Sequence, residues 1–406
     1  MGSFSLPKER KGKERKGNEK MTQQPLEFDR ENALKFDSEN AENICDFDGE
    51  NKLITISSGD VEAVVCTYGA TLYSVRVVDR KRAMREVTFH PGREGEKEEE
   101  KREGEKQEKT REGEKQEKTR EGEKEEEGRE KNSFKAACCD GFFGSSIGPV
   151  ANRIAGGTYM MEGEKYQCPL NDGGDRPNTL HGGPRGFHSR VWRVGNVNAE
   201  ETSVELHLDG VCMEEDGFPG TVNVTAAYSV KGHDLTIRYT VAALDVPTPC
   251  MMTNHAYWKL DDADSVLEHH ALTLHHTHVL PVDGNLVPNS PHKLVETSEL
   301  SAELDSCFVT PNALDAISSG GRGRTANPVR LVAELSSSAS GISMQVLTDM
   351  PALQVYAGSG VQNSAVCLEA QFPPNAINNE SLRNAVTVSA KGGPWSSTTV
   401  HRFSHV

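Results

Sequence analysis

The stretch Leu235-Thr236-Ile237-Arg238-Tyr239-Thr240-Val241 alternates apolar and polar side chains along its whole length. Successive side chains of a β-strand point to opposite faces of the sheet, so this period of two indicates a strand with one buried face. Segments 64–68 and 202–208 are similarly short and are followed by Gly or Asp, as is typical of strands that end in turns. Since no long amphipathic helix accompanies such segments, the sequence predicts an all-β fold, a large antiparallel β-sandwich.

Two segments lack the apolar residues that a folded core needs. Residues 1–44 are polar, and residues 93–131 repeat Arg-Glu-Gly-Glu-Lys with a nine-residue period that starts at positions 93, 102, 111 and 120. This composition predicts disorder, with a solvated helix held by Glu–Lys pairs as the alternative. We therefore predict a polar N-terminal extension, 1–44, and a single β-sandwich domain, 45–406, which the low-complexity insert 93–131 interrupts between two strands.

The composition argues against several functional classes. A formal net charge of −16 disfavours a nucleic-acid surface, because phosphate binding needs a concentrated positive field. No apolar run is long enough to cross a bilayer and no secretory signal is present, so we expect no membrane association and an intracellular, cytoplasmic protein. The nine cysteines show no paired C-x-x-C motifs, and the histidines between positions 269 and 278 lack partners for a tetrahedral site, so no metal is expected.

His255 and Glu369 are the candidate catalytic residues. They lie in Thr253-Asn254-His255-Ala256-Tyr257-Trp258 and Val366-Cys367-Leu368-Glu369-Ala370-Gln371, two distant segments that each resemble a buried strand. An imidazole and a carboxylate that meet in one pocket can give and take a proton on one substrate. On spacing alone, a core histidine and an edge-strand or ion-paired glutamate are the alternatives, because a buried carboxylate is costly unless something pairs with it.

The order of several short segments resembles the aldose 1-epimerase, or galactose mutarotase, family. They are Gly148-Pro149-Val150-Ala151-Asn152-Arg153-Ile154-Ala155, Asn178-Thr179-Leu180-His181-Gly182-Gly183, Asp216-Gly217-Phe218-Pro219-Gly220, Asn254-His255-Ala256-Tyr257-Trp258, Pro281-Val282-Asp283 and Cys367-Leu368-Glu369-Ala370-Gln371. The resemblance implies a galactose mutarotase-like supersandwich with its site in a cleft on a concave sheet face. It also implies interconversion of the anomers of free hexoses such as galactose and glucose, without cofactor or metal.

The resemblance also implies a role for each site residue. Glu369 is the expected base for the C1 hydroxyl and His255 the expected acid for the ring oxygen. Sugar hydroxyls are expected to be bound by Asn152, Arg153, His181, Asp305 and Gln354. A structural salt bridge is the alternative for Arg153. To act as an acid near neutral pH His255 needs a proton, and we expect a nearby carboxylate, Glu369 or Asp305, to favour its charged form.

Two positions depart from the family pattern. Asp305 is followed by Ser306, where the family has His, and Asn375 stands where the family usually has Asp. Neither change removes the acid or the base, but both bear on substrate preference. Two alternatives stay open: a hexose-phosphate epimerase of the related fold, which needs a further basic cluster, and a non-catalytic sugar-binding protein, which needs neither proton-transfer residue. The expected partner is an aldose sugar, and the expected state is a monomer or weak dimer.

Overall fold

The computed structural model describes residues 44–46, 50–90, 141–198, 202–275, 278–288, 304–309, 328–357 and 364–405. The predicted extension 1–44, except residue 44, and the predicted insert 93–131 therefore lie outside the described residues. Those described all belong to one unit, Glu42–Val406. Within this part of the chain the single α-helix is α3 (Val266–His269), and no helix is long and apolar enough to cross a membrane.

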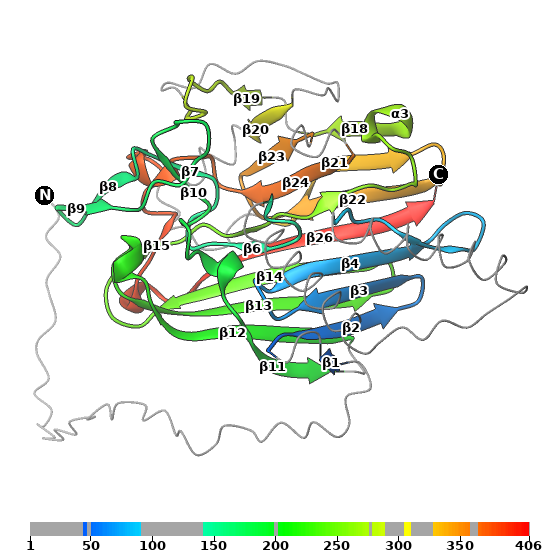
Figure 1. Ribbon diagram of the computed structural model, residues 1–406, viewed down its shortest axis with the longest axis horizontal. Coiled ribbons are helices and arrows are strands. Elements are labelled where there is room, and N and C mark those ends of the chain that lie inside the picture. Colours follow the sequence, from blue (N-terminus) through cyan, green and yellow to red (C-terminus); the bar gives the residue numbers. More distant parts are fainter. Residues whose placement is uncertain are drawn as a thin grey trace, which may run out of the picture. The chain divides into compact units, whose positions relative to one another are not determined.

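The largest sheet is antiparallel and has eight strands, in the order β11-β12-β13-β14-β26-β22-β21-β18 (Figure 1). Their bounds are β11 (Arg193–Asn198), β12 (Ser203–Cys212), β13 (Thr221–Lys231), β14 (Asp234–Ala243), β18 (His270–Leu274), β21 (Arg330–Ser337), β22 (Ile342–Thr348) and β26 (Trp395–His405). The alternating stretch 235–241 lies within β14, where its apolar residues are buried and its polar residues half-buried or exposed. The prediction of a strand with one buried face is confirmed.

Two five-stranded antiparallel sheets form the second layer. One contains β1 (Ile44–Asp46), β2 (Lys52–Ser58), β3 (Val61–Cys66), β4 (Thr71–Val78) and β5 (Met84–Glu86); the other contains β17 (Tyr257–Trp258), β24 (Val366–Gln371), β23 (Ala352–Tyr356), β20 (Asp305–Val309) and β19 (His278–Leu280). A bridge between Thr88 and Trp258 connects the two sheets. Strands β2 and β3 contact β13, so the first of these sheets covers that part of the large sheet.

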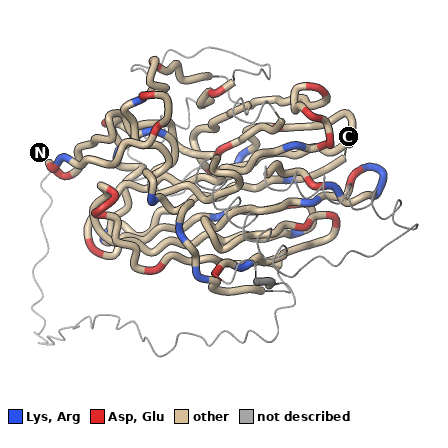
Figure 2. Tube along the Cα trace, in the orientation of Figure 1, with Lys and Arg blue, Asp and Glu red and all other residues tan. Residues whose placement is uncertain are grey.

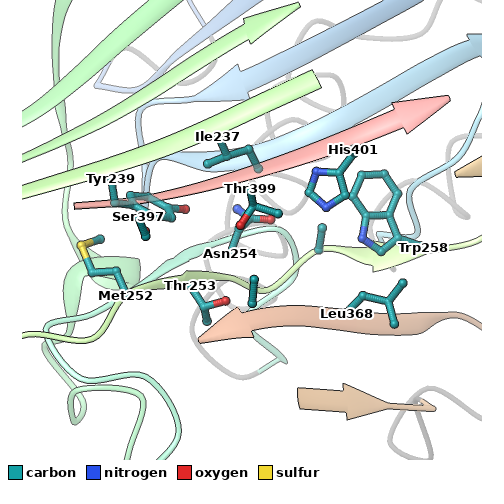
Figure 3. Close-up of a pocket in the computed structure, with 12 residues that line it drawn as sticks. Ile237, Tyr239, Met252, Thr253, Asn254, Trp258, Leu368, Ser397, Thr399 and His401 are labelled. Carbon is teal, nitrogen blue, oxygen red and sulfur yellow. The ribbon is translucent and has the colours of Figure 1, made fainter. Parts of the chain in front are cut away.

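The second five-stranded sheet packs on β14 and β26. Figure 3 shows Trp258 and Leu368 from this sheet facing Ile237 and His401 from the large sheet. Trp258 lies against the His401 ring, with a centroid separation of 4.6 Å. Burial lowers the pKa of His401 to about 3, so this imidazole is neutral and belongs to the core. The two layers make the antiparallel β-sandwich that the sequence predicts.

Short elements complete the described part. The paired strands are β6 (Ser146–Ile147) with β16 (Thr253–Asn254), β7 (Arg153–Ala155) with β10 (Asn178–Leu180), β8 (Thr158–Met161) with β9 (Glu164–Gln167), and β15 (Thr248–Pro249) with β25 (Thr387–Val388); the 3-10 helices are η4 (Phe187–Ser189), η5 (Glu214–Asp216), η7 (Ala376–Asn378) and η8 (Ala390–Gly392). Figure 2 shows acidic and basic residues interspersed, mostly in loops and at strand ends. The site residues lie where β7, β10 and β16 approach β24.

Candidate active site

Strand β24 places Glu369 on the sheet face that points away from the large sheet. Its neighbours Leu368 and Ala370 line the space between the layers, so Glu369 lies on the opposite face. Gln354 of β23 is its direct partner in the antiparallel register. The Gln354 amide nitrogen donates a hydrogen bond to Oδ1 of Asp305, which begins β20. Three predicted residues from three adjacent strands therefore share one face.

His255 lies in the short connection between β16 and β17. Its backbone N–H donates to the Ser145 carbonyl at 3.0 Å, and its carbonyl accepts from the Gly144 N–H at 2.9 Å. The imidazole is buried, with Nε2 3.7 Å from Oε1 of Glu369 and Nδ1 3.6 Å from Sγ of Cys367. These contacts hold the ring with Nε2 directed toward the carboxyl group.

Asn152 and His181 approach the pair from another direction, at the ends of β7 and β10. Both adopt a left-handed backbone conformation, with φ of 59° and 53°, which is uncommon for residues other than glycine and often marks functional sites. The Asn152 backbone N–H donates to Nδ1 of His181 at 3.2 Å. Because Nδ1 accepts, a neutral His181 carries its proton on Nε2 and can donate from that atom.

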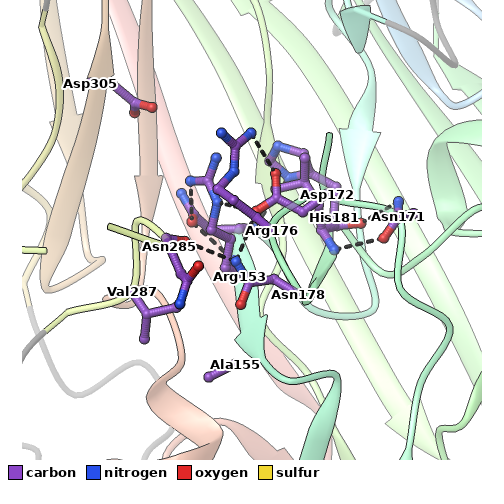
Figure 4. Close-up of polar contacts among 12 residues, drawn as sticks. Arg153, Ala155, Asn171, Asp172, Arg176, Asn178, His181, Asn285, Val287 and Asp305 are labelled. Atoms are coloured by element: carbon purple, nitrogen blue, oxygen red, sulfur yellow. Dashed lines mark hydrogen bonds and ion pairs between the residues drawn. The ribbon is translucent and has the colours of Figure 1, made fainter. Parts of the chain in front are cut away.

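Arg153 is held by a carboxylate that the sequence analysis missed (Figure 4). Its Nε donates to Oδ2 of Asp172 at 2.8 Å, and Arg176 donates to Oδ1 of the same carboxylate at 2.9 Å. Burial alone would raise the pKa of Asp172, but hydrogen bonds from Arg176, Asn178 and Arg153 outweigh it and lower the pKa. The salt bridge named as the alternative for Arg153 is thus present. This salt bridge orients the Arg153 guanidinium, and it does not exclude a role for Arg153 in binding a sugar.

All seven predicted residues belong to one cluster. One ligand atom from each of His181, His255 and Glu369 lies within 4.8 Å of the others. Charges on Asp305 and Arg153 both act on Glu369, the first raising and the second lowering its pKa. All seven are buried except Asp305, which is half-buried. Residues spread from position 152 to position 369 therefore converge.

The protonation of the pair differs from the sequence-based expectation. Burial and, to a lesser extent, the Asp305 charge raise the pKa of Glu369 to about 8. Burial, with a smaller effect from His188, lowers the pKa of His255 to about 4. The expectation that a nearby carboxylate favours charged His255 is wrong, because burial lowers the pKa of His255 and keeps Glu369 protonated near neutral pH. Between these values the pair holds one proton.

His181, His255 and Glu369 are also the one group among the described residues with the composition and spacing of a metal site. A metal-bound histidine normally donates its other ring N–H to an acceptor. His181 does the opposite, because its Nδ1 accepts from the Asn152 backbone. Its Nε2 then carries a proton and has no lone pair for a metal, so this arrangement suits a hydrogen-bond donor to substrate better than a metal ligand.

An aromatic cluster beside the pair was also missed by the sequence analysis. The Phe142 ring lies 4.5 Å from the His181 ring, 5.0 Å from the His188 ring and 5.8 Å from the His255 ring, measured between centroids. His188 is buried, and burial lowers its pKa to about 4. Phe142 is the second residue after a stretch that the structure does not describe, and no sequence motif signals its position. These apolar surroundings keep the imidazoles of His181, His188 and His255 neutral.

Comparisons with known proteins show which family the chain resembles. A family model described as aldose 1-epimerase matches residues 124–402. The chain is 30% identical over 285 residues to a galactose mutarotase from Bos taurus, covering 65% of this chain and 79% of that protein. It is also 30% identical over 288 residues to an aldose 1-epimerase from Escherichia coli K12, covering 64% of this chain and 80% of the relative.

Solved structures show the same fold. An aldose epimerase homologue from C. elegans superimposes with a TM-score of 0.66 at 22% identity, covering 88% of this chain and 99% of that one. A galactose 1-epimerase from Lactobacillus acidophilus superimposes with a TM-score of 0.60 at 21% identity, covering 87% and 95%. The predicted supersandwich is confirmed by these similarities.

Proposed function

The chain belongs to the aldose 1-epimerase family, and from this premise we propose that Glu369 and His255 interconvert the α and β anomers of free hexoses such as galactose and glucose. The family reaction is an isomerisation of aldose anomers. The observation that carries the assignment to these residues is the buried contact of 3.7 Å between His255 Nε2 and Glu369 Oε1. A pair that shares one proton can supply both an acid and a base.

The proposed reaction opens and recloses the sugar ring. Glu369, as the carboxylate, takes the proton of the C1 hydroxyl while the bond from C1 to the ring oxygen breaks. The ring oxygen keeps that electron pair and takes a proton from His255, which leaves an open-chain aldehyde. Rotation about the C1–C2 bond presents the other carbonyl face, and the reverse transfers close the ring as the other anomer. The reactive form of the pair therefore has its one proton on His255, which binding of the sugar must favour.

The remaining residues supply hydrogen bonds for the sugar. Arg153 offers N–H donors fixed by Asp172, and His181 offers its Nε2–H. Gln354 and Asp305 already share one hydrogen bond and keep further capacity for hydroxyl groups. This dense set of donors and acceptors around a buried acid–base pair supports binding of a small, uncharged polyol.

The hexose-phosphate alternative has less support. Arg153 and Arg176 are two cations beside the site, but both bind the Asp172 carboxylate, which offsets much of their charge. The described residues of the site therefore offer no concentrated positive charge to a phosphate. A cytoplasmic location and a monomer or weak dimer remain predictions from the sequence.

NMR exchange spectroscopy on equilibrated sugars tests the proposed substrate class. Exchange cross-peaks between the α and β C1 protons of galactose or glucose should appear when the protein is added. Galactose 6-phosphate and glucose 6-phosphate should show much weaker exchange at the same concentrations. Faster exchange of the phosphates than of the free hexoses would contradict the proposal.

A further inference from the structure

Gln371, the last residue of β24, is fully buried, yet neither atom of its side-chain amide has a hydrogen-bond partner among the described residues. In the same part of the chain Oε2 of Glu369 and Oε1 of Gln354 are also buried without a partner. Glu369 and Gln371 are two apart on β24, and Gln354 is opposite Glu369 on β23. The unpaired atoms therefore belong to neighbouring side chains of one sheet face.

The side chain opposite Gln371 on the neighbouring strand offers the amide nothing to bind. Its partner in register is Ala352, which belongs to a buried apolar cluster with Leu280, Cys307 and Val309. A side-chain amide can donate two hydrogen bonds and accept two, and buried polar groups in folded proteins are nearly always paired. A fully buried glutamine with both ends unpaired destabilises the folded protein unless a ligand satisfies it.

We propose that Gln371 is a further substrate-binding residue, which hydrogen-bonds a sugar hydroxyl remote from the C1 hydroxyl that Glu369 engages. The inference rests on the proposed function and extends it to specificity. Residues two apart on a strand are separated by roughly 7 Å, so one hexose can bridge Glu369 and Gln371. A site that hydrogen-bonds a hydroxyl discriminates strongly against sugars that lack it, since the buried amide is then left unpaired again.

This role and a structural role predict opposite effects on stability. Gln371→Met keeps the length of the side chain and removes the unpaired polar atoms. If the amide serves the sugar, the variant should be more stable without sugar, with a thermal midpoint raised by roughly 2–4 °C, and should bind sugar less well. If the amide holds the fold together, the variant should be less stable.

The decisive experiment compares kcat/KM for galactose with kcat/KM for its 2-, 3-, 4- and 6-deoxy derivatives. For the wild-type protein, removal of the hydroxyl that contacts Gln371 should lower kcat/KM by about 5- to 100-fold. The Gln371→Met variant should show that loss already with galactose, and no further loss with that deoxy sugar. Gln345→Met is the matched control, because Gln345 on β22 pairs with Glu334 instead of facing the site.

The possible outcomes separate the two proposals. A wild-type protein inactive on galactose contradicts the proposed function. If the wild-type protein is active but the kcat/KM of Gln371→Met falls by the same factor as that of wild type with every deoxy sugar, the assignment of Gln371 is contradicted. The proposed function is not contradicted by that result. A lowered thermal midpoint in Gln371→Met with unchanged kcat/KM also contradicts it. Loss of the dependence on one hydroxyl, with a raised midpoint, supports it.

Discussion

Nε2 of His255 lies 3.7 Å from Oε1 of Glu369, and both side chains are almost completely removed from solvent. Burial disfavours the charged form of each group, so the pKa of Glu369 rises to about 8 and that of His255 falls to about 4. The neutral pair and the ion pair contain the same single proton. A bound sugar therefore needs only to redistribute that proton for the site to have a carboxylate base and an imidazolium acid.

Glu369→Gln should nearly abolish turnover while sugar binding is largely kept. The amide retains the shape and hydrogen-bonding capacity of the carboxyl group but has no basic lone pair. We expect kcat to fall by roughly two to four orders of magnitude. Polarimetric assays give kcat, and calorimetric titration with galactose gives the affinity. A variant that keeps most of its turnover would remove Glu369 from the role of base.

The pH profile of kcat/KM should be bell-shaped, with limbs near about 4 and about 8. Below the lower value His255 gains a proton while Glu369 is already protonated, so the pair has no base. Above the upper value Glu369 loses its proton while His255 is neutral, so the pair has no acid. The pair titrates as a unit, and the limbs are properties of both residues.

His255→Ala tests that assignment. The variant should lose most activity, and its residual rate should lose the alkaline limb and rise with pH through the pKa of Glu369, because the Glu369 carboxylate is then the one base and no imidazole acid is left. His207→Ala is a suitable control, since His207 lies on β12 and bonds to Thr225. An alkaline limb that persists unchanged in His255→Ala would assign it to another group.

Asp172→Asn should weaken sugar binding and stability together. The carboxylate binds two guanidiniums, and its loss leaves Arg153 without its buried counter-charge. We expect KM to rise and the free energy of unfolding to fall by about 3 kcal/mol, as for other broken buried pairs.

Since the pKa of Asp172 is lowered in the folded state, wild-type stability from this group is present above its unfolded pKa and lost as pH falls through the folded pKa. Urea unfolding at pH 7 and at pH 3 should show the difference between the two proteins shrinking at the lower pH.

Replacement of residues 93–131 by a short Gly/Ser linker should preserve both fold and activity. The residues on either side of the undescribed stretch are attached to the same strand, because the Phe89 N–H donates to the Tyr257 carbonyl at 2.8 Å and the Phe143 ring lies 4.4 Å from the Tyr257 ring. A linker can therefore close between neighbouring points at small entropic cost. A large drop in turnover on free sugar, with an unchanged thermal midpoint, would show that the repeat acts on catalysis.

Much of the site could be predicted because it depends on local patterns. The alternation in 235–241 predicted a strand with one buried face, and β14 has that pattern of burial. The candidate residues were selected from short segments whose order resembles one family. Their convergence then follows from strand pairing, as the register of Gln354 with Glu369 shows.

The remaining features depend on three-dimensional packing, which a local pattern does not encode. The pairing of Arg153 and Arg176 on Asp172 depends on how the chain between β9 and β10 folds back. The direction of the pKa shift of His255 was predicted wrongly, because a nearby carboxylate was assumed to be charged. Burial on all sides decides that charge, and it depends on residues such as Phe142 that no motif identified.

Polarimetry of freshly dissolved α-galactose and α-glucose is the most direct test of the central claim. Added wild-type protein should accelerate the approach to the equilibrium rotation for at least one sugar, in proportion to protein concentration, without changing the final value. Glu369→Gln at the same concentration should leave the rate close to that of buffer alone. An unchanged approach to equilibrium for both sugars with the folded wild-type protein would contradict the account.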